Sequence, residues 1–193
     1  MKENIVQKIL LSMLIVIGMS VQNSGAREIA GVMVQESIQS ENGVELLLNG
    51  AGIRSKFFFD IYIAELYLEQ SAATAAEVIA GGGVKRIVMH FLYDEVGRDK
   101  LIAGWDEGFA ENTTADTLKL IQERTIAFNE LFVDVKKGDQ VILEFTPGAG
   151  TSVMIAGEKK GVIPGKDFND ALLNIWLGEK PVTKKLKGKL LGK

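Results

Sequence analysis

The sequence predicts an α+β domain in which an antiparallel sheet carries a layer of helices on one face. Strand-like segments come first, two amphipathic helical segments follow at 96–110 and 115–132, and further strands precede a last helix at 168–177. Turn-forming residues separate consecutive strands. This order of elements is typical of an antiparallel sheet whose helices gather on one side.

The first strands are predicted by one turn and one long apolar run. Asn42-Gly43 lies between apolar segments at 32–38 and 44–48, and both residues tolerate the positive φ of a tight hairpin turn. The run 56–68 is apolar at odd and even positions alike. A strand of this kind is covered on both faces. We expect helices on one face and either more protein or a ligand on the other.

The remaining elements follow from periodicity and capping signals. A short helix is expected at 71–80 before three glycines, and a strand at 84–93. Strands at 140–146 and 152–156 form a hairpin, and a second tight turn is expected at 158–161. Asp167 is the expected N-cap of the last helix.

The N-terminal segment 1–26 has the pattern of a secretory signal peptide. Lys2 and Lys8 precede an apolar run at 9–21, and small residues end the segment at Ala26. We expect cleavage after Ala26 and export, to the periplasm of a bacterial-type envelope; an uncleaved anchor is the alternative. The domain then covers 27–182.

A lysine-rich tail, 183–193, follows the domain. We expect a solvated end, with weak attraction to an anionic membrane surface as the alternative. The whole chain of 193 residues has a net charge of −3 and a pI near 5.4, which argues against a nucleic-acid partner.

The composition also excludes several kinds of catalytic and cofactor site. The chain has no cysteine and a single histidine, His90, so thiolate metal sites and Cys–His catalysis are excluded. His90 lies within a predicted strand and is expected to have a structural role. The glycines at 50 and 52 do not open a dinucleotide-binding motif, because the third glycine would fall on Ser55. We predict no cofactor and no metal.

Arg54 is the one residue whose position calls for an explanation. It stands at the start of the most apolar strand, and its guanidinium stays charged and offers a planar set of donors suited to carboxylates. It could hold the anionic head of an amphipathic ligand at the mouth of an apolar cavity. It could equally form an internal ion pair with Asp60 or with an acid of the 94–99 segment. The spacing does not decide between them.

Three stretches together resemble the chalcone isomerase-like superfamily, in particular its exported bacterial members: 49-NGAGIRSKFFFDIYIAELYLE-69, 93-YDEVGRDKLIAGW-105 and 161-GVIPGKDFNDALLNIWLGEKPV-182. The resemblance covers about 32–182. It implies an open-faced β-sandwich, with a large antiparallel sheet, a helical layer on one face and a ligand cleft between them. The superfamily includes plant enzymes that cyclise a chalcone, fatty-acid-binding proteins, and members without known catalysis.

The resemblance also implies a ligand site. The arginine and the tyrosine of the family's site fall on Arg54 and Tyr93. The enzymes' threonine, asparagine and hydroxyl positions fall on Tyr62, Lys100 and Ile175, whose chemistry differs. An anion-holding pair, Arg54 and Tyr93, therefore remains beside an apolar wall, while the groups that position a polyphenol do not.

Three functional hypotheses follow from these residues. The favoured one is an exported, non-catalytic protein that binds an amphipathic anion such as a fatty acid, with Arg54, Tyr93, Lys100, Tyr62 and Ile175 at the site. The second is an isomerase or lyase acting on an enone-like molecule. The third is a structural or interaction protein of the cell envelope, in which side chains close the cleft and Arg54 forms an ion pair.

Overall fold

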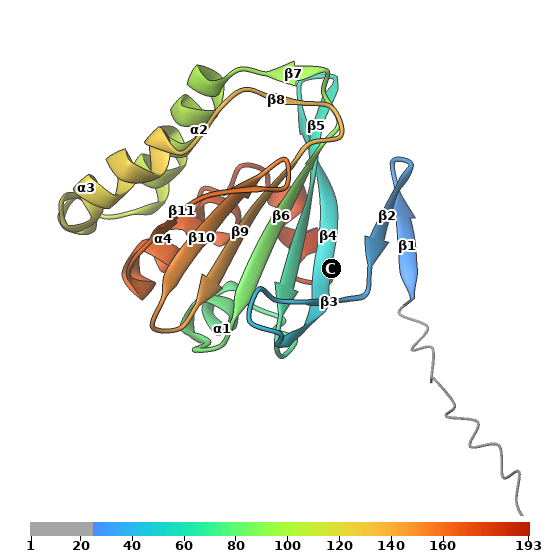
Figure 1. Ribbon diagram of the computed structural model, residues 1–193, viewed down its shortest axis with the longest axis horizontal. Helices are drawn as coiled ribbons and strands as arrows, with labels where there is room; N and C mark the ends of the chain where they lie inside the picture. The colour runs from blue at the N-terminus through green and yellow to red at the C-terminus, as the bar shows by residue number, and fades with distance from the viewer. Residues whose placement is uncertain (1–24) are drawn as a thin grey trace, which may run out of the picture.

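A curled seven-stranded antiparallel sheet is the centre of the computed structural model, which describes residues 25–193 (Figure 1). The strand order is β11-β10-β9-β6-β5-β4-β3. The strands are β3 (Ser37–Gln39), β4 (Glu45–Lys56), β5 (Phe59–Leu68), β6 (Lys85–Phe91), β9 (Gln140–Thr146), β10 (Gly150–Ile155) and β11 (Glu158–Ile163). Two short two-stranded sheets lie outside it: the hairpin of β1 (Ala26–Ile29) and β2 (Val32–Gln35), and the pair of β7 (Glu95–Val96) and β8 (Val135–Lys136).

Five helices accompany the sheet in the described part of the chain. They are α1 (Ala75–Ala80), α2 (Arg98–Asn112), α3 (Ala115–Glu130), α4 (Lys166–Leu177) and α5 (Lys184–Leu190). In Figure 1 α4 lies behind the sheet, and α2 and α3 extend from its upper left. All five contribute to one apolar cluster with one face of the sheet. The predicted fold class is therefore confirmed, including the helices on a single face.

The two faces of the sheet are covered by different parts of the chain. Along β5, Ala64 and Leu66 face the helices, whereas Ile63 and Tyr67 belong to a second cluster on the opposite face. Val34 of β2 is buried in that second cluster, so the N-terminal hairpin covers the face that the helices leave free. The expectation of a strand covered on both sides is thus met by protein on the face opposite the helices.

The C-terminal tail folds against β4 instead of remaining solvated. Leu186, Leu190 and Leu191 are buried, and α5 packs where β4 carries Gly50 and Gly52. A Cβ atom at position 50 would overlap the backbone carbonyls of α5, which explains why glycine is needed there. The sequence predicted a solvated tail because lysines outnumber leucines in this segment.

Three local predictions were wrong. The run 56–68 is interrupted, because Phe57 and Phe58 form the β4–β5 turn and the strand begins at Phe59. The expected turn at 158–161 is part of β11, and Ala156-Gly157 make the turn before it. Asp167 does not cap α4, which begins after Gly165.

Asp167 has a different structural partner. Its two carboxylate oxygens accept hydrogen bonds from Arg124 of α3, at 2.7 and 2.6 Å. This contact holds the pKa of Asp167 below its ordinary value. The pair joins α3 to the start of α4.

The predicted signal peptide lies almost wholly outside the described residues, because the structure describes the chain only from residue 25. Among residues 25–193, no helix is both long and apolar enough to cross a membrane.

Candidate functional site

A cavity of about 460 Å³ opens between the sheet and α2, near the β4–β5 turn. Its wall includes all five residues that the sequence singled out: Arg54, Tyr62, Tyr93, Lys100 and Ile175. They come from β4, β5, the loop after β6, α2 and α4 respectively. Its volume falls within the range of roughly 300–1,000 Å³ that is usual for small-ligand sites.

Arg54 and Tyr62 form the structural centre of this site. They are cross-strand partners on β4 and β5, and the guanidinium carbon of Arg54 lies 5.5 Å from the centroid of the Tyr62 ring. This is a cation–π contact, which holds the guanidinium over an apolar surface without neutralising it. Arg54 is partly exposed, so its donors remain accessible.

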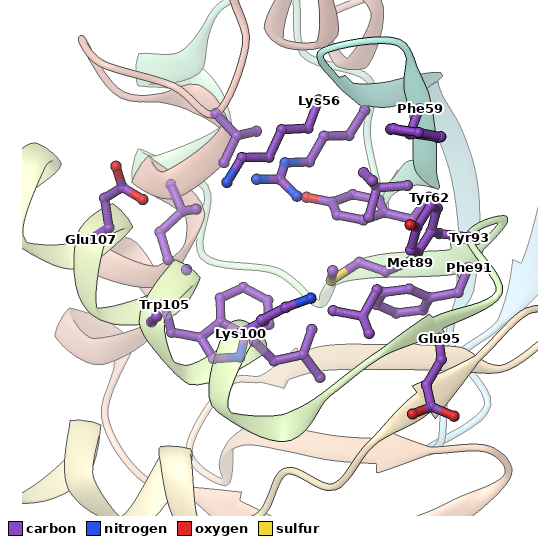
Figure 2. A pocket seen from close by; sticks show the side chains of 18 of the residues that line it. Lys56, Phe59, Tyr62, Met89, Phe91, Tyr93, Glu95, Lys100, Trp105 and Glu107 are labelled. Carbon is purple, nitrogen blue, oxygen red and sulfur yellow. The ribbon is translucent and has the colours of Figure 1, made fainter.

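Tyr62 is held in place by a buried hydrogen bond. Trp176 of α4 donates its Nε1 hydrogen to Tyr62 Oη at 3.0 Å, and only 4% of Tyr62 is exposed. Burial raises the pKa of the Tyr62 phenol above its ordinary value, although the Arg54 charge and the Trp176 bond act in the opposite direction. Tyr62 is therefore a protonated phenol at neutral pH, and its own proton is free to be donated. Figure 2 shows its hydroxyl directed toward the cavity.

Tyr93 lies at the rim, where 36% of it is exposed. Its ring packs edge-to-face on Phe59 with 5.5 Å between centroids. The tyrosine in direct contact with Arg54 is thus Tyr62, and Tyr93 marks the entrance. Spacing along the sequence could not separate a buried from a rim position, since both residues belong to the same apolar wall.

Two further wall residues were missed as site residues. Lys56 follows Arg54 by two positions on β4, and Figure 2 shows its amine and that of Lys100 directed into the cavity from opposite sides. The alternation of side chains along a strand could have identified Lys56. Trp105 of α2 is buried, and its indole N–H has no hydrogen-bond partner among the described residues. In the sequence it lies in the amphipathic helical segment 96–110 and carries no separate signal of a site.

The carboxylates near the cavity do not neutralise Arg54. Within residues 25–193 Arg54 forms no ion pair. Asp60, one of the expected partners, instead accepts a hydrogen bond from Ser55 Oγ at 2.6 Å. Figure 2 shows the carboxylate of Glu95 directed away from the cavity. Both premises of the structural hypothesis, a closed cleft and a paired Arg54, therefore fail.

His90 lies on β6, where its side chain contacts that of a residue on the neighbouring strand β9. Its Nδ1 lies 3.2 Å from Nε2 of Gln140 on the neighbouring strand, and burial lowers its pKa. In the described part of the chain, no cluster of histidine, aspartate and glutamate side chains has the arrangement of a metal site.

The fold and the cavity define a class of protein: a curled antiparallel sheet with helices on one face and a small-ligand cavity between them. The chain belongs to the chalcone isomerase-like family, whose model matches residues 26–192. This match confirms the resemblance carried by the three sequence motifs, and it extends through α5.

One solved structure similar to the chain is a fatty-acid-binding protein of Arabidopsis thaliana. The two share 17% sequence identity with a TM-score of 0.55, and the match covers 81% of this chain and 96% of that one. At this identity the similarity establishes the fold alone. A sequence comparison with curated proteins finds no match.

Proposed function

We propose that the protein is a non-catalytic carrier or buffer of an amphipathic anion, with a fatty acid as the ligand class. The carboxylate would be held by Arg54 and the Tyr62 hydroxyl, and the tail would lie against the apolar wall between the sheet and α2. Tyr93, Lys56 and Lys100 would line the entrance of the cavity. The fatty-acid-binding protein that shares the fold supports this choice of ligand class.

The observation that carries the proposal is an unpaired guanidinium beside an apolar cavity. Arg54 is kept in position by Tyr62 and has no carboxylate partner among residues 25–193, so its charge is available to an anion. Tyr62, protonated and fixed by Trp176, adds a second donor. Wall residues such as Met89, Phe91 and Leu101 offer no partner to a polar tail.

The two parts of the ligand would contribute differently to affinity. A charge-assisted hydrogen bond contributes roughly 1.5–3 kcal/mol net, whereas each buried CH₂ adds about 0.8 kcal/mol. A tail of several methylenes therefore supplies most of the affinity, and Arg54 fixes its orientation. Affinity should rise with chain length until the cavity is full.

The test begins with native mass spectrometry of the protein from its own host, followed by extraction and identification of the bound molecule. Binding of a fatty acid and of its methyl ester is then measured for the parent, for Arg54→Ala and for Lys119→Ala. Lys119 is an exposed lysine of α3 outside the cavity, so its removal controls for lost charge.

We expect Arg54→Ala to weaken fatty-acid binding about tenfold to a hundredfold, with little effect on the ester and none from Lys119→Ala. Equal affinity of the parent and Arg54→Ala for the fatty acid would overturn the proposed role of Arg54. No binding of either ligand by the parent protein would overturn the function.

The isomerase or lyase alternative has less support. Tyr62, Lys100 and Ile175 stand where the resemblance places the enzymes' polar positioning groups, and the raised pKa of Tyr62 disfavours it as a base. Turnover of an enone by the parent protein, lost in Arg54→Ala, would favour the enzyme.

We also propose that the protein is exported to the periplasm, on the strength of the 1–26 pattern. Cleavage after Ala26 would keep the ion pair in which Arg27 Nε donates to Glu36 Oε1 at 2.7 Å. Mass spectrometry of the secreted form should give Arg27 as the first residue; a protein that still begins at Met1 would contradict this.

A further inference from the structure

The β4–β5 turn exposes three consecutive aromatic side chains beside the cavity. Phe57 and Phe58 are 87% and 100% exposed, and Phe59, which opens β5, is 56% exposed. Phe57 and Phe59 also line the cavity, together with Lys56. We call residues 56–59 the aromatic tip. Phe57 and Phe59 thus extend the apolar wall of the proposed ligand site out to solvent.

The composition of the tip is unfavourable for a turn in water. Lys56 pairs with Phe59, which makes a two-residue hairpin loop of Phe57 and Phe58. Loops of this length favour Asn-Gly or another glycine-containing pair. Phe57 instead adopts φ of +57°, a conformation that costs a bulky side chain free energy. Turn geometry does not explain Phe57, and packing does not explain Phe58, which is fully exposed.

The aromatic tip is better suited to a lipid surface than to a protein surface. Three aromatic rings offer about 450–750 Å² at most, which is less than the roughly 800 Å² per partner of a standard protein interface. A lipid interface accepts isolated aromatic side chains, and basic residues beside them add attraction to anionic headgroups. Arg54, Lys56 and Lys100 outnumber the acids Glu95 and Glu107 in the cavity wall.

We propose that the aromatic tip inserts into the surface of a lipid bilayer and places the cavity mouth against it. The proposal rests in part on the proposed function, because an amphipathic anion resides in bilayers and would enter the cavity there without crossing water. Phe58 would be the deepest residue, with Lys56 at the headgroup level.

The test is flotation of the delipidated protein with vesicles of phosphatidylcholine and phosphatidylglycerol. Phe58→Ser removes the fully exposed ring, which lies outside the cavity wall. Leu120→Ser removes an exposed apolar side chain of α3 and is the matched control, since Leu120 is 76% exposed. Because the chain has no cysteine, Phe58→Cys and Leu120→Cys can each carry a single polarity-sensitive dye.

We expect Phe58→Ser to lower the vesicle partition coefficient about tenfold or more and Leu120→Ser to leave it unchanged. The dye at position 58, and not at 120, should report an apolar environment when vesicles are added. Unchanged partition in Phe58→Ser, or no vesicle binding by the parent protein, would overturn the proposal. Self-association of the parent without vesicles, abolished by Phe58→Ser, would assign the tip to a second copy instead.

These outcomes are independent of ligand binding. Vesicle binding is measured without fatty acid, so a protein that binds vesicles through Phe58 but takes no carboxylate keeps this proposal and loses the proposed function. If the protein binds fatty acid but Phe58→Ser has no effect on vesicle binding, the proposed function is kept and the membrane proposal is overturned.

Discussion

Arg54 and Tyr62 face each other across β4 and β5, with 5.5 Å between the guanidinium carbon and the ring centroid. Tyr62 is in turn fixed by the hydrogen bond from Trp176. One chain of contacts therefore links α4, in the helix layer, to the charged group of the cavity. The orientation of Arg54 depends on the packing of α4 as well as on its own strand.

Tyr62→Phe should distinguish the contribution of the Tyr62 hydroxyl from that of its ring. The variant keeps the aromatic face under Arg54 but removes the donor to the ligand and leaves Trp176 Nε1 without its acceptor. We expect fatty-acid affinity to fall about twofold to tenfold and stability to fall by about 1–3 kcal/mol. Calorimetric titration and urea unfolding measure the two effects. Unchanged affinity would mean that Tyr62 only supports Arg54.

Gly104 and Gly108 of α2 provide a matched pair of substitutions. A Cβ atom at Gly104, in the cavity wall, meets no neighbour, whereas one at Gly108 would lie 2.9 Å from Ile175. We expect Gly104→Ala to stabilise the protein by up to about 1 kcal/mol, and Gly108→Ala to destabilise it by about 1–3 kcal/mol. Thermal unfolding of both variants is the measurement. If both substitutions stabilised the protein, helix propensity alone would determine their effects on stability.

Gly104→Leu should place a side chain in the cavity and reduce the length of tail that it accepts. Binding of a series of fatty acids to the variant should reach its plateau at a shorter chain than in the parent protein, while affinity for the shortest acids stays the same. Gly104→Ala is the control for the lost glycine. A uniform loss of affinity for all chain lengths would place the tail elsewhere.

Glu65 should make stability depend on pH. It is buried on the sheet face opposite the helices, where burial raises its pKa above the ordinary 4.5. Tyr67 Oη lies 3.0 Å from the Gln35 carbonyl oxygen and 2.9 Å from Glu65 Oε2. Because a phenol carries one proton, both contacts are satisfied when Glu65 is protonated.

The sign of the effect follows from that protonation. The unfolded chain releases the Glu65 proton at a lower pH than the folded chain does. The free energy of unfolding therefore decreases as pH rises from about 4.5 to the pKa of Glu65 in the folded protein. We expect Glu65→Gln to be more stable than the parent at pH 7 and this difference to shrink as pH falls to 4.5. Urea midpoints at several pH values measure it. A constant difference would mean that Glu65 stays ionised in the folded protein.

Gly50→Ala tests the docking of α5. The added methyl would overlap the carbonyls of Lys189 and Leu190, so we expect a loss of about 1–3 kcal/mol or detachment of the helix. Gly82→Ala is the control, because a Cβ atom there meets no neighbour. Hydrogen exchange of residues 184–190 should rise in the first variant only. Unaltered protection would show that β4 can shift to accommodate the methyl.

The fold class could be predicted from the sequence because it rests on long patterns that tertiary packing preserves. Of the five cavity residues, Arg54 was indicated by its position, and the other four were implied by the resemblance to the chalcone isomerase-like family. The predicted succession of strands and helices along the chain is present in the structure, and the family model matches residues 26–192. Local features that depend on a single contact could not be predicted, and the cap of α4 is an example. Asp167 has the right residue type for a cap, but Arg124 binds it.

The missed features share a second cause, which is that amphipathic signals are ambiguous when they are short. The lysines of the tail 183–193 predict a solvated end, whereas its three leucines are buried. Phe57 and Phe58 continue an apolar run that predicts a strand, but they form a turn and are 87% and 100% exposed. Hydrophobicity alone does not distinguish a buried strand from an exposed turn.

Both tryptophans of the chain are tied to the cavity: Trp105 forms part of its wall, and Trp176 is bonded to Tyr62. The tryptophan emission of the protein therefore comes from the neighbourhood of the proposed ligand. Occupancy should change its intensity or wavelength without any label. A library of natural lipids could thus be screened optically on the unmodified protein.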